Sequence, residues 1–282
     1  MTLDFRRDRV RGAAAEMLLA ARHEIVPVKG AEEKFSDLPP GSTVTITSSP
    51  RFGLVRTLQY ATLLAEHGFR AVPHLAARDI ASKSQLDETL DQLHAIGVSE
   101  VFVIGGDGPR PRGQYPSAVE LVEAMHDRPH APQRIGVAAY PEGHPVVGDR
   151  QLLDALLRKQ RCADYMTSQI CFDAAVVESW LRRLRAAGVR LPLYLGIPGS
   201  LRRSKLLELS LKLGVGPSMR FVRKQRGLLS GLARPGAYHP GAIVAGTSAW
   251  IADPELRVAG IQVFTFNEVE RTVAWERQVA AR

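Results

Sequence analysis

The sequence has only two cysteines, Cys162 and Cys171, among its 282 residues. No CxxC pair or Cys/His cluster has metal-ligand spacing, so neither a disulfide scaffold nor a zinc module is indicated, and we expect no metal site. Long apolar runs are lacking as well. No stretch approaches the length of a membrane span, and the charged N-terminus has no apolar segment of the kind found in secretory leaders. We therefore expect a cytoplasmic protein without a membrane partner.

Acidic residues are fewer than basic ones, because 29 Asp and Glu face 37 Lys and Arg, a formal charge of +8. This balance favours anionic partners, which include nucleic acid, phospholipid and small anionic ligands. Many basic residues lie between Arg182 and Arg234, but apolar residues interrupt them at helical spacing. That spacing favours solvated faces of amphipathic helices over a nucleic-acid groove. Since interleaved aromatic residues and recognised motifs are also lacking, we expect no nucleic-acid partner.

Short apolar or β-branched runs alternate with longer helical patterns along most of the chain. The predicted strands are 23–27, 43–48, 71–75, 100–105, 134–139, 165–169, 191–197 and 260–266. The predicted helices are 54–67, 86–96, 118–125, 152–161, 174–187, 206–213 and 268–280, with two more joined by a loop within 220–252. Eight alternating strands favour an α/β fold with a single (β/α)8 TIM barrel over an open doubly wound sheet, although both fit the pattern. We expect one catalytic barrel domain over residues 1–282.

Polar residues at strand ends are the candidates for chemistry, because barrel active sites lie at the carboxyl ends of the strands. Glu24 falls within the first strand. If it points inward, desolvation raises its pKa and makes it a general acid, and the equal alternative is an outward or Arg-paired carboxylate. Asp107 follows Gly105-Gly106, in a ligand-binding loop or a tight Asp-Gly turn. His144 lies in a rigid proline-bracketed loop, as a ligand-binding or a surface residue. Asp173 is predicted to be a helix N-cap.

Five segments along the chain form a pattern: Glu24, Pro73-His74-Leu75, Gly106-Asp107, Tyr140-Pro141-Glu142-Gly143-His144-Pro145, and Gln169 with Phe172-Asp173. In this order and spacing they resemble the methylenetetrahydrofolate reductase family over nearly the whole chain. The most specific element is the proline-bracketed motif after strand 134–139.

The resemblance implies roles for these residues. Glu24 corresponds to the catalytic general acid that opens the imidazolidine ring of 5,10-methylenetetrahydrofolate. Asp107 corresponds to a catalytic aspartate beside the folate and the flavin ring, whose charge favours the cationic iminium. Gln169 corresponds to the amide that contacts the pterin, so Gln169 and Asp107 would bind the substrate. The positions matching residues that hold the flavin are Thr47, His74, Tyr140, His144 and Lys159, the last two towards its phosphates.

The chain departs from the family pattern on the flavin side. Gly105 stands where the family usually has an arginine, Ser48-Ser49 replace an aromatic residue, and Leu152 replaces an aspartate seven residues before Lys159. The turn before strand 165–169 is shortened to Arg161-Cys162-Ala163. We therefore expect weak or absent binding of FAD, with hydride passing directly from NADH or NADPH to the folate. Such an oxidoreductase would act in one-carbon metabolism and methionine biosynthesis.

The alternative interpretation is a non-catalytic or regulatory folate-binding barrel that keeps the pterin contacts but has lost hydride transfer. Turnover separates the two hypotheses. The sequence also predicts that the regulatory domain of the longer eukaryotic relatives is absent. It leaves open the choice between NADH and NADPH, the oligomeric state, the direction of the reaction in the cell and the length of a folate glutamate tail.

Overall fold

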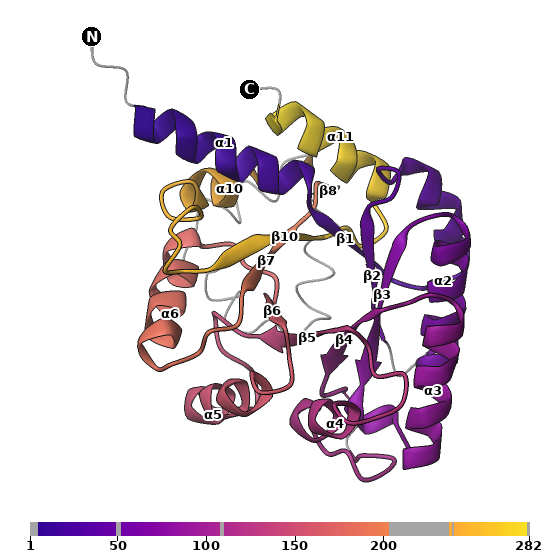
Figure 1. Cartoon of the computed structure of the whole chain (residues 1–282). Coiled ribbons are helices and arrows are strands. Elements are labelled where there is room, and N and C mark those ends of the chain that lie inside the picture. The colour runs from indigo at the N-terminus through magenta and orange to yellow at the C-terminus, as the bar shows by residue number, and fades with distance from the viewer. Residues whose placement is uncertain (1–4, 49–51, 108–109, 203–236, 239, 281–282) are drawn as a thin grey trace.

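The computed structural model describes residues 5–48, 52–107, 110–202, 237–238 and 240–280 (Figure 1). Eight parallel strands close into a barrel in the order β1-β10-β7-β6-β5-β4-β3-β2. They are β1 (Arg22–Ile25), β2 (Thr43–Ile46), β3 (Arg70–Ala76), β4 (Glu100–Ile104), β5 (Arg134–Ala139), β6 (Tyr165–Ser168), β7 (Leu193–Pro198) and β10 (Val258–Phe264). The prediction of a (β/α)8 TIM barrel is confirmed, since β1 and β10 pair and leave no open edge.

Helices surround the barrel. They are α1 (Phe5–Leu19), α2 (Gly53–Glu66), α3 (Lys83–Ala95), α4 (Ala118–Met125), α5 (Asp149–Lys159), α6 (Ala174–Ala186), α10 (Gly241–Thr247) and α11 (Val269–Ala280), with short 3-10 helices η1 (Ala31–Asp37) and η2 (Ala77–Asp79). Helices α2 to α6 and α11 lie where the periodicity predicts them. The predicted helix 206–213 lies outside the described residues, as does most of 220–252, of which α10 is described.

Several differences from the predicted elements have local causes. Helix α1 was not predicted because its first half is densely charged, yet Ala14 and Leu18 are buried and the helix packs against α11 (Figure 1). The last barrel strand ends two residues early because Phe266 and Asn267 adopt positive φ angles of 49° and 65°, which turn the chain out of the sheet. A two-stranded antiparallel pair, β8 (Leu201–Arg202) with β9 (Ala237–Tyr238), was also not predicted.

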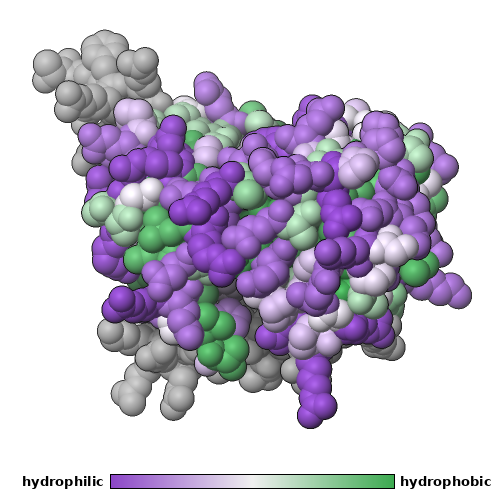
Figure 2. All heavy atoms as spheres, turned by 60° about the horizontal axis from the view of Figure 1, so that its bottom comes forward, coloured by the Kyte–Doolittle hydropathy of each residue, from purple (hydrophilic) through white to green (hydrophobic). Residues whose placement is uncertain are grey.

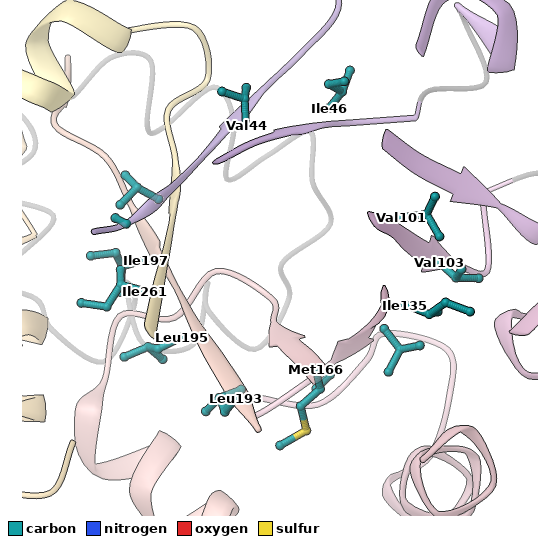
Figure 3. Packing of buried hydrophobic residues seen from close by; sticks show 14 of the residues in the cluster. Val44, Ile46, Val101, Val103, Ile135, Met166, Leu193, Leu195, Ile197 and Ile261 are labelled. Atoms are coloured by element: carbon teal, nitrogen blue, oxygen red, sulfur yellow. The ribbon is translucent and has the colours of Figure 1, made fainter. Parts of the chain in front are cut away.

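The main hydrophobic core lies between the barrel and its helices. Successive strand residues point to opposite faces, so alternate side chains leave the barrel towards the helices. Figure 3 shows Val101, Val103 and Ile135 on one side of the barrel and Leu193 and Leu195 on another, all directed outward. All five are nearly or completely buried. Burial of such side chains contributes roughly 1.5–3 kcal/mol each, so this layer supplies most of the driving force for closure.

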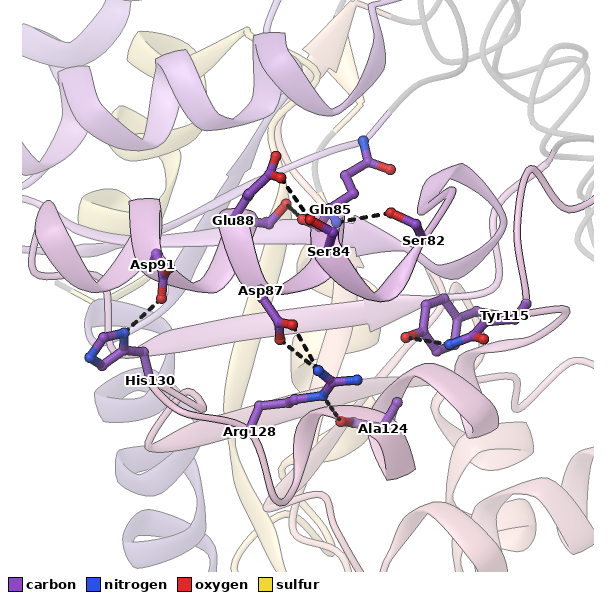
Figure 4. Close-up of polar contacts among 12 residues, drawn as sticks. Ser82, Ser84, Gln85, Asp87, Glu88, Asp91, Tyr115, Ala124, Arg128 and His130 are labelled. Atoms are coloured by element: carbon purple, nitrogen blue, oxygen red, sulfur yellow. Dashed lines mark hydrogen bonds and ion pairs between the residues drawn. The ribbon is translucent and has the colours of Figure 1, made fainter.

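Side-chain contacts fix the ends of the outer helices. Ser82 caps α3 by accepting a hydrogen bond from the Gln85 amide at 3.0 Å. Just after α4, Arg128 donates to both carboxylate oxygens of Asp87 on α3 at 2.8 Å (Figure 4). Asp173 accepts from two amides of the first turn of α6, at 2.9 and 3.3 Å, as an N-cap residue does.

The outer surface is mostly polar. Figure 2 shows a largely hydrophilic face on which apolar residues form small separate areas. In the described part of the chain, the exposed large hydrophobic residues are Leu19, Val55, Val146 and Val176. No described helix is both long and apolar enough to cross a membrane.

The inward-facing side chains of the barrel divide into three levels. An apolar and aromatic cluster that includes Val72, Phe102 and Tyr165 fills the middle. Arg22 on β1 lies towards the amino ends of the strands and Glu24 towards the carboxyl ends, because residues two apart share a face. Polar groups therefore lie at both ends of an apolar and aromatic centre, and the carboxyl end holds the candidate site.

Candidate active site

A cavity of about 440 Å³ opens at the carboxyl ends of the strands. The sequence-predicted residues that line it are Glu24, Thr47, His74, Asp107, Tyr140, His144 and Gln169. Lys159 lies outside it, in two adjoining cavities of about 500 and 730 Å³ that share Tyr140 and His144 with the first. The acid of β1, the acid after β4 and the amide after β6 thus meet at one mouth of the barrel.

Glu24 points into the barrel from β1 and is 8% exposed. Its partner is Gln262 of β10, whose Nε2 donates to the Glu24 Oε2 at 2.9 Å. Burial raises the pKa of Glu24 to about 8, and the hydrogen bond from Gln262 opposes that rise. The carboxyl group is therefore mostly protonated at neutral pH. A buried acid with a transferable proton suits general-acid chemistry.

His74 on β3 faces the same carboxyl group, with 3.7 Å between its Nε2 and the Glu24 Oε2. Burial lowers the pKa of His74 to about 3, so the imidazole is neutral. With Glu24 protonated as well, this approach is a contact between neutral groups and not an ion pair. The His74 Nε2 has no hydrogen-bond partner among the described residues, and its ring packs 4.7 Å from that of Phe102.

Asp107 lies exposed at the rim, directly after Gly106. Gly106 adopts a φ of 90°, and a Cβ there would lie 3.2 Å from the Ala76 Cβ, so the turn requires glycine. The negative charge of Asp107 acts on two neighbours. Burial raises the pKa of Tyr140 and Asp107 adds to the rise, while burial lowers the pKa of His144 and Asp107 opposes the fall. The Asp107 carboxylate thus contributes negative charge at the cavity mouth.

Local hydrogen bonds orient His144 and Gln169. The His144 Nδ1 accepts from the amides of Val146 and Val147 at 3.3 and 3.2 Å, which leaves Nε2 as the protonated nitrogen of the neutral ring. Gln169 accepts the Ile170 amide on its Oε1 at 2.8 Å, so its NH₂ group stays available as a donor. Both side chains present donors to a ligand in the cavity.

Lys159 is 6% exposed at the end of α5, and its Nζ donates to the Ala138 carbonyl at 3.2 Å. Burial lowers the pKa of Lys159 to about 8. The ammonium group still carries its charge at neutral pH, beside the cavities that adjoin Glu24. It can therefore attract an anionic group such as a phosphate.

Sequence reasoning missed two residues of the cavity wall, Gln262 and Thr167. Both are buried, and the Gln262 Oε1 and Thr167 Oγ1 have no hydrogen-bond partner among the described residues. Buried polar atoms are normally paired with protein, ligand or ordered water, so these two atoms are available to hydrogen-bond a polar ligand in the cavity. In the sequence, each could have been recognised as a polar residue at an inward-facing position of an otherwise apolar strand.

A closed parallel barrel with polar residues gathered at the carboxyl ends of its strands has the arrangement of TIM-barrel enzymes. The methylenetetrahydrofolate reductase family model matches residues 34–201, more than half of the sequence. The chain belongs to this family. Glu24 and Gln262 lie outside the matched range, so their assignment to the candidate site is based on the geometry of the cavity.

Two curated relatives carry the same family name. The chain is 27% identical over 148 residues to methylenetetrahydrofolate reductase 2 of Saccharomyces cerevisiae, covering 49% of the chain and 24% of that protein. It is 25% identical over 132 residues to methylenetetrahydrofolate reductase 1 of Schizosaccharomyces pombe, covering 44% and 22%. The matched part thus spans about a quarter of either relative.

Among solved structures, a phosphonopyruvate hydrolase in complex with oxalate and Mg²⁺ superposes with a TM-score of 0.51 at 11% identity. The superposition covers 98% of this chain and 86% of that one. This similarity shows the barrel fold alone.

Proposed function

We propose that this barrel, as one catalytic domain, reduces 5,10-methylenetetrahydrofolate to 5-methyltetrahydrofolate with hydride from NADH or NADPH. Family membership supports the folate substrate. The observation that carries the proposal is the burial of Glu24, which raises its pKa to about 8, in the same cavity as Asp107 and Gln169. In this assignment Gln169 binds the pterin with its free NH₂ group.

The proton step falls to Glu24. Its carboxyl group donates a proton to N10 of the folate, the bond between N10 and the methylene carbon breaks, and an iminium forms at N5. Glu24 becomes a carboxylate, which the hydrogen bond from Gln262 stabilises. The neutral His74 cannot compete for the proton, because its pKa lies far below that of Glu24.

The hydride step follows at the same carbon. Asp107 favours the cationic iminium through its negative charge at the rim. The hydride and its electron pair pass from C4 of the dihydronicotinamide to the methylene carbon, which becomes the N5-methyl group, and the dinucleotide leaves oxidised. One proton and one hydride are consumed, so the reaction balances.

The residues beside the cavity do not fit a tightly held FAD. Leu152 lines both adjoining cavities at the position of the family's aspartate, and Gly105 brings no side chain to the mouth. In the proposed reaction the hydride therefore does not pass through a flavin. The larger adjoining cavity carries Lys159 and Arg183, whose charges suit the phosphates of a nicotinamide dinucleotide.

Purified protein is expected to lack stoichiometric flavin absorption in the visible spectrum and to oxidise NADH or NADPH only when methylenetetrahydrofolate is present. The physical reason is the loss of flavin-side groups at Gly105 and Leu152. Spectroscopy of the protein as isolated, followed by an anaerobic turnover assay, makes the measurement. Stoichiometric flavin would defeat the direct-hydride step and leave the reductase assignment intact.

Replacing Gln262 by leucine is expected to move the alkaline limb of the kcat profile to higher pH. The hydrogen bond from Gln262 favours the charged form of Glu24, so its loss raises the pKa of that acid. Lys159 also has a pKa of about 8, and Lys159→Met serves as the control, since removing it leaves the Glu24 limb in place. If the alkaline limb keeps its position in Gln262→Leu but is absent in Lys159→Met, the group that titrates is Lys159 and not Glu24.

A further inference from the structure

A second cavity, of about 560 Å³, lies at the opposite end of the barrel, between α1 and the amino ends of the strands. Its lining includes three arginines, Arg22 of β1, Arg70 of β3 and Arg134 of β5, together with Glu100 and Tyr194. It shares no lining residue with the candidate active site. The family assignment and the proposed reaction leave this cluster without a role.

Positive charge is in surplus here. Arg22 donates to one oxygen of Glu100 at 2.6 Å, and Arg134 donates to the other at 3.4 Å. Arg70 donates to the Thr43 hydroxyl at 3.1 Å, which brings no charge. Among the described residues, the only other carboxylate on the cavity wall is that of Glu16 on α1, which is exposed to solvent. Three arginines thus face two carboxylates on the cavity wall, and Glu100 alone is shared by two of the arginines, so the lining keeps a net positive charge.

Two of the three guanidinium groups, those of Arg22 and Arg134, pack against aromatic rings. Arg22 is 5% exposed, and its guanidinium carbon lies 4.7 Å from the ring centre of Tyr165 and 3.8 Å from that of Tyr194. Arg134 lies 4.9 Å from the Tyr165 ring centre and donates to the Tyr194 hydroxyl at 3.3 Å. Stacking on aromatic faces leaves the guanidinium edges free to donate.

Most of the N–H donors of the three arginines have no partner among the described residues. Each guanidinium has five N–H donors, yet within the described residues Arg22 and Arg70 each donate one hydrogen bond and Arg134 donates two. Arginine forks match the paired oxygens of carboxylate and phosphate groups. The cavity is also large enough for a molecule that bears more than one such group.

We propose that this amino-end cavity binds a small polyanion with carboxylate or phosphate groups, at a site separate from the folate site. Arg70 and Arg134 contact the anion, and Arg22 supplies charge from beneath. Carboxylate and phosphate groups both present paired, negatively charged oxygens, and this shared feature is what the guanidinium groups would bind.

The test is calorimetric titration of the full chain with pyrophosphate and, separately, with citrate, both at constant ionic strength set with chloride. Binding of either probe is expected, and the probe that binds more tightly identifies the phosphate or the carboxylate source. Arg70→Gln is expected to weaken binding about tenfold or more, because it removes charge-assisted hydrogen bonds. Arg134→Gln provides a second variant with the same expected loss.

Arg182→Gln is the matched control, since Arg182 is a half-exposed arginine on α6 that pairs with Glu178 and lies outside the cavity. It is expected to bind the probes as the parent chain does. The proposal is overturned if neither probe binds, if binding survives in both Arg70→Gln and Arg134→Gln, or if Arg182→Gln weakens it equally. Loss of binding with unchanged folate turnover would leave the proposed function untouched.

Discussion

Replacing Glu24 by glutamine is expected to lower kcat by roughly 10²–10⁴-fold while folate binding is retained. Glutamine keeps the shape of the side chain and an oxygen that can accept the hydrogen bond from Gln262. It has no proton to give to N10 at neutral pH, so the imidazolidine ring stays closed. Steady-state oxidation of the dinucleotide measures the loss, and direct titration with the folate measures binding.

Glu276→Gln is the matched control for Glu24→Gln. Glu276 is also nearly buried, at 3% exposure, but it hydrogen-bonds His23 between β1 and α11, outside the cavity. Its replacement should leave kcat near the parent value. A Glu24→Gln enzyme that turns over at the parent rate would refute the general-acid role. Folate binding without any turnover in the parent chain would instead support the non-catalytic folate-binding barrel.

Glu24 also links activity and stability to pH. Because its pKa in the folded chain is raised to about 8, the parent kcat is expected to fall as pH rises through that value. The unfolded chain ionises this group near its ordinary pKa of 4.5 and the folded chain only near 8, so the stability that protonated Glu24 contributes at low pH is lost progressively between these two values. Thermal unfolding should therefore show Glu24→Gln gaining stability relative to the parent chain as pH rises through this range, with the full difference reached at about pH 8.

Replacing Gly136 by alanine is expected to destabilise the fold by about 1–3 kcal/mol or more. Gly136 lies inside the barrel on β5, and a Cβ there would lie 2.2 Å from the Cζ of Tyr165 on the neighbouring strand β6. Tyr165 is completely buried and stacks with Arg22, so its ring has little room to move. Urea unfolding followed by circular dichroism provides the measurement.

Gly12→Ala is the matched control, because a Cβ at Gly12 in α1 would meet no atom within 4 Å. It should stabilise the chain by about 0.5–1 kcal/mol, since glycine is unfavourable within a helix. Combining Gly136→Ala with Tyr165→Leu removes the ring atoms that clash, so the double variant should lose less than the two single losses added together. Strict additivity would show that the Tyr165 ring is not what excludes a side chain at position 136.

Much of the fold is readable in the chain itself. The β-branched runs around Val101 to Ile104 and the helical spacing of 174–187 predict strands and helices that the structure contains. Local periodicity is enough to predict these elements, because the outward-facing strand residues and the inner helix faces are both apolar and pack against each other. Helix α1 was not predicted, because the charged residues in its first half hide the apolar periodicity of the helix. Its buried face packs against α11 at the other end of the chain.

For the candidate site too, the sequence predicts some of the residues and only the structure shows how they come together. Glu24, Asp107 and Gln169 were predicted because barrel active sites lie at the carboxyl ends of the strands and because the order of the motifs resembles a family. Their convergence in one cavity, and the choice of Gln262 as the partner of Glu24, depend on β10 closing against β1. Residues 24 and 262 are far apart in the chain, so no local pattern could pair them.

Sequence alone determined the alternation of strands and helices and which residue types end each strand, because these follow from short-range steric and hydrophobic preferences. Only the tertiary structure decided which way Glu24 points, what lies beside it, and that three arginines share one cavity at the opposite end. A pKa and a charge surplus arise from burial and from neighbours brought together in space, and both exist only once the barrel has closed.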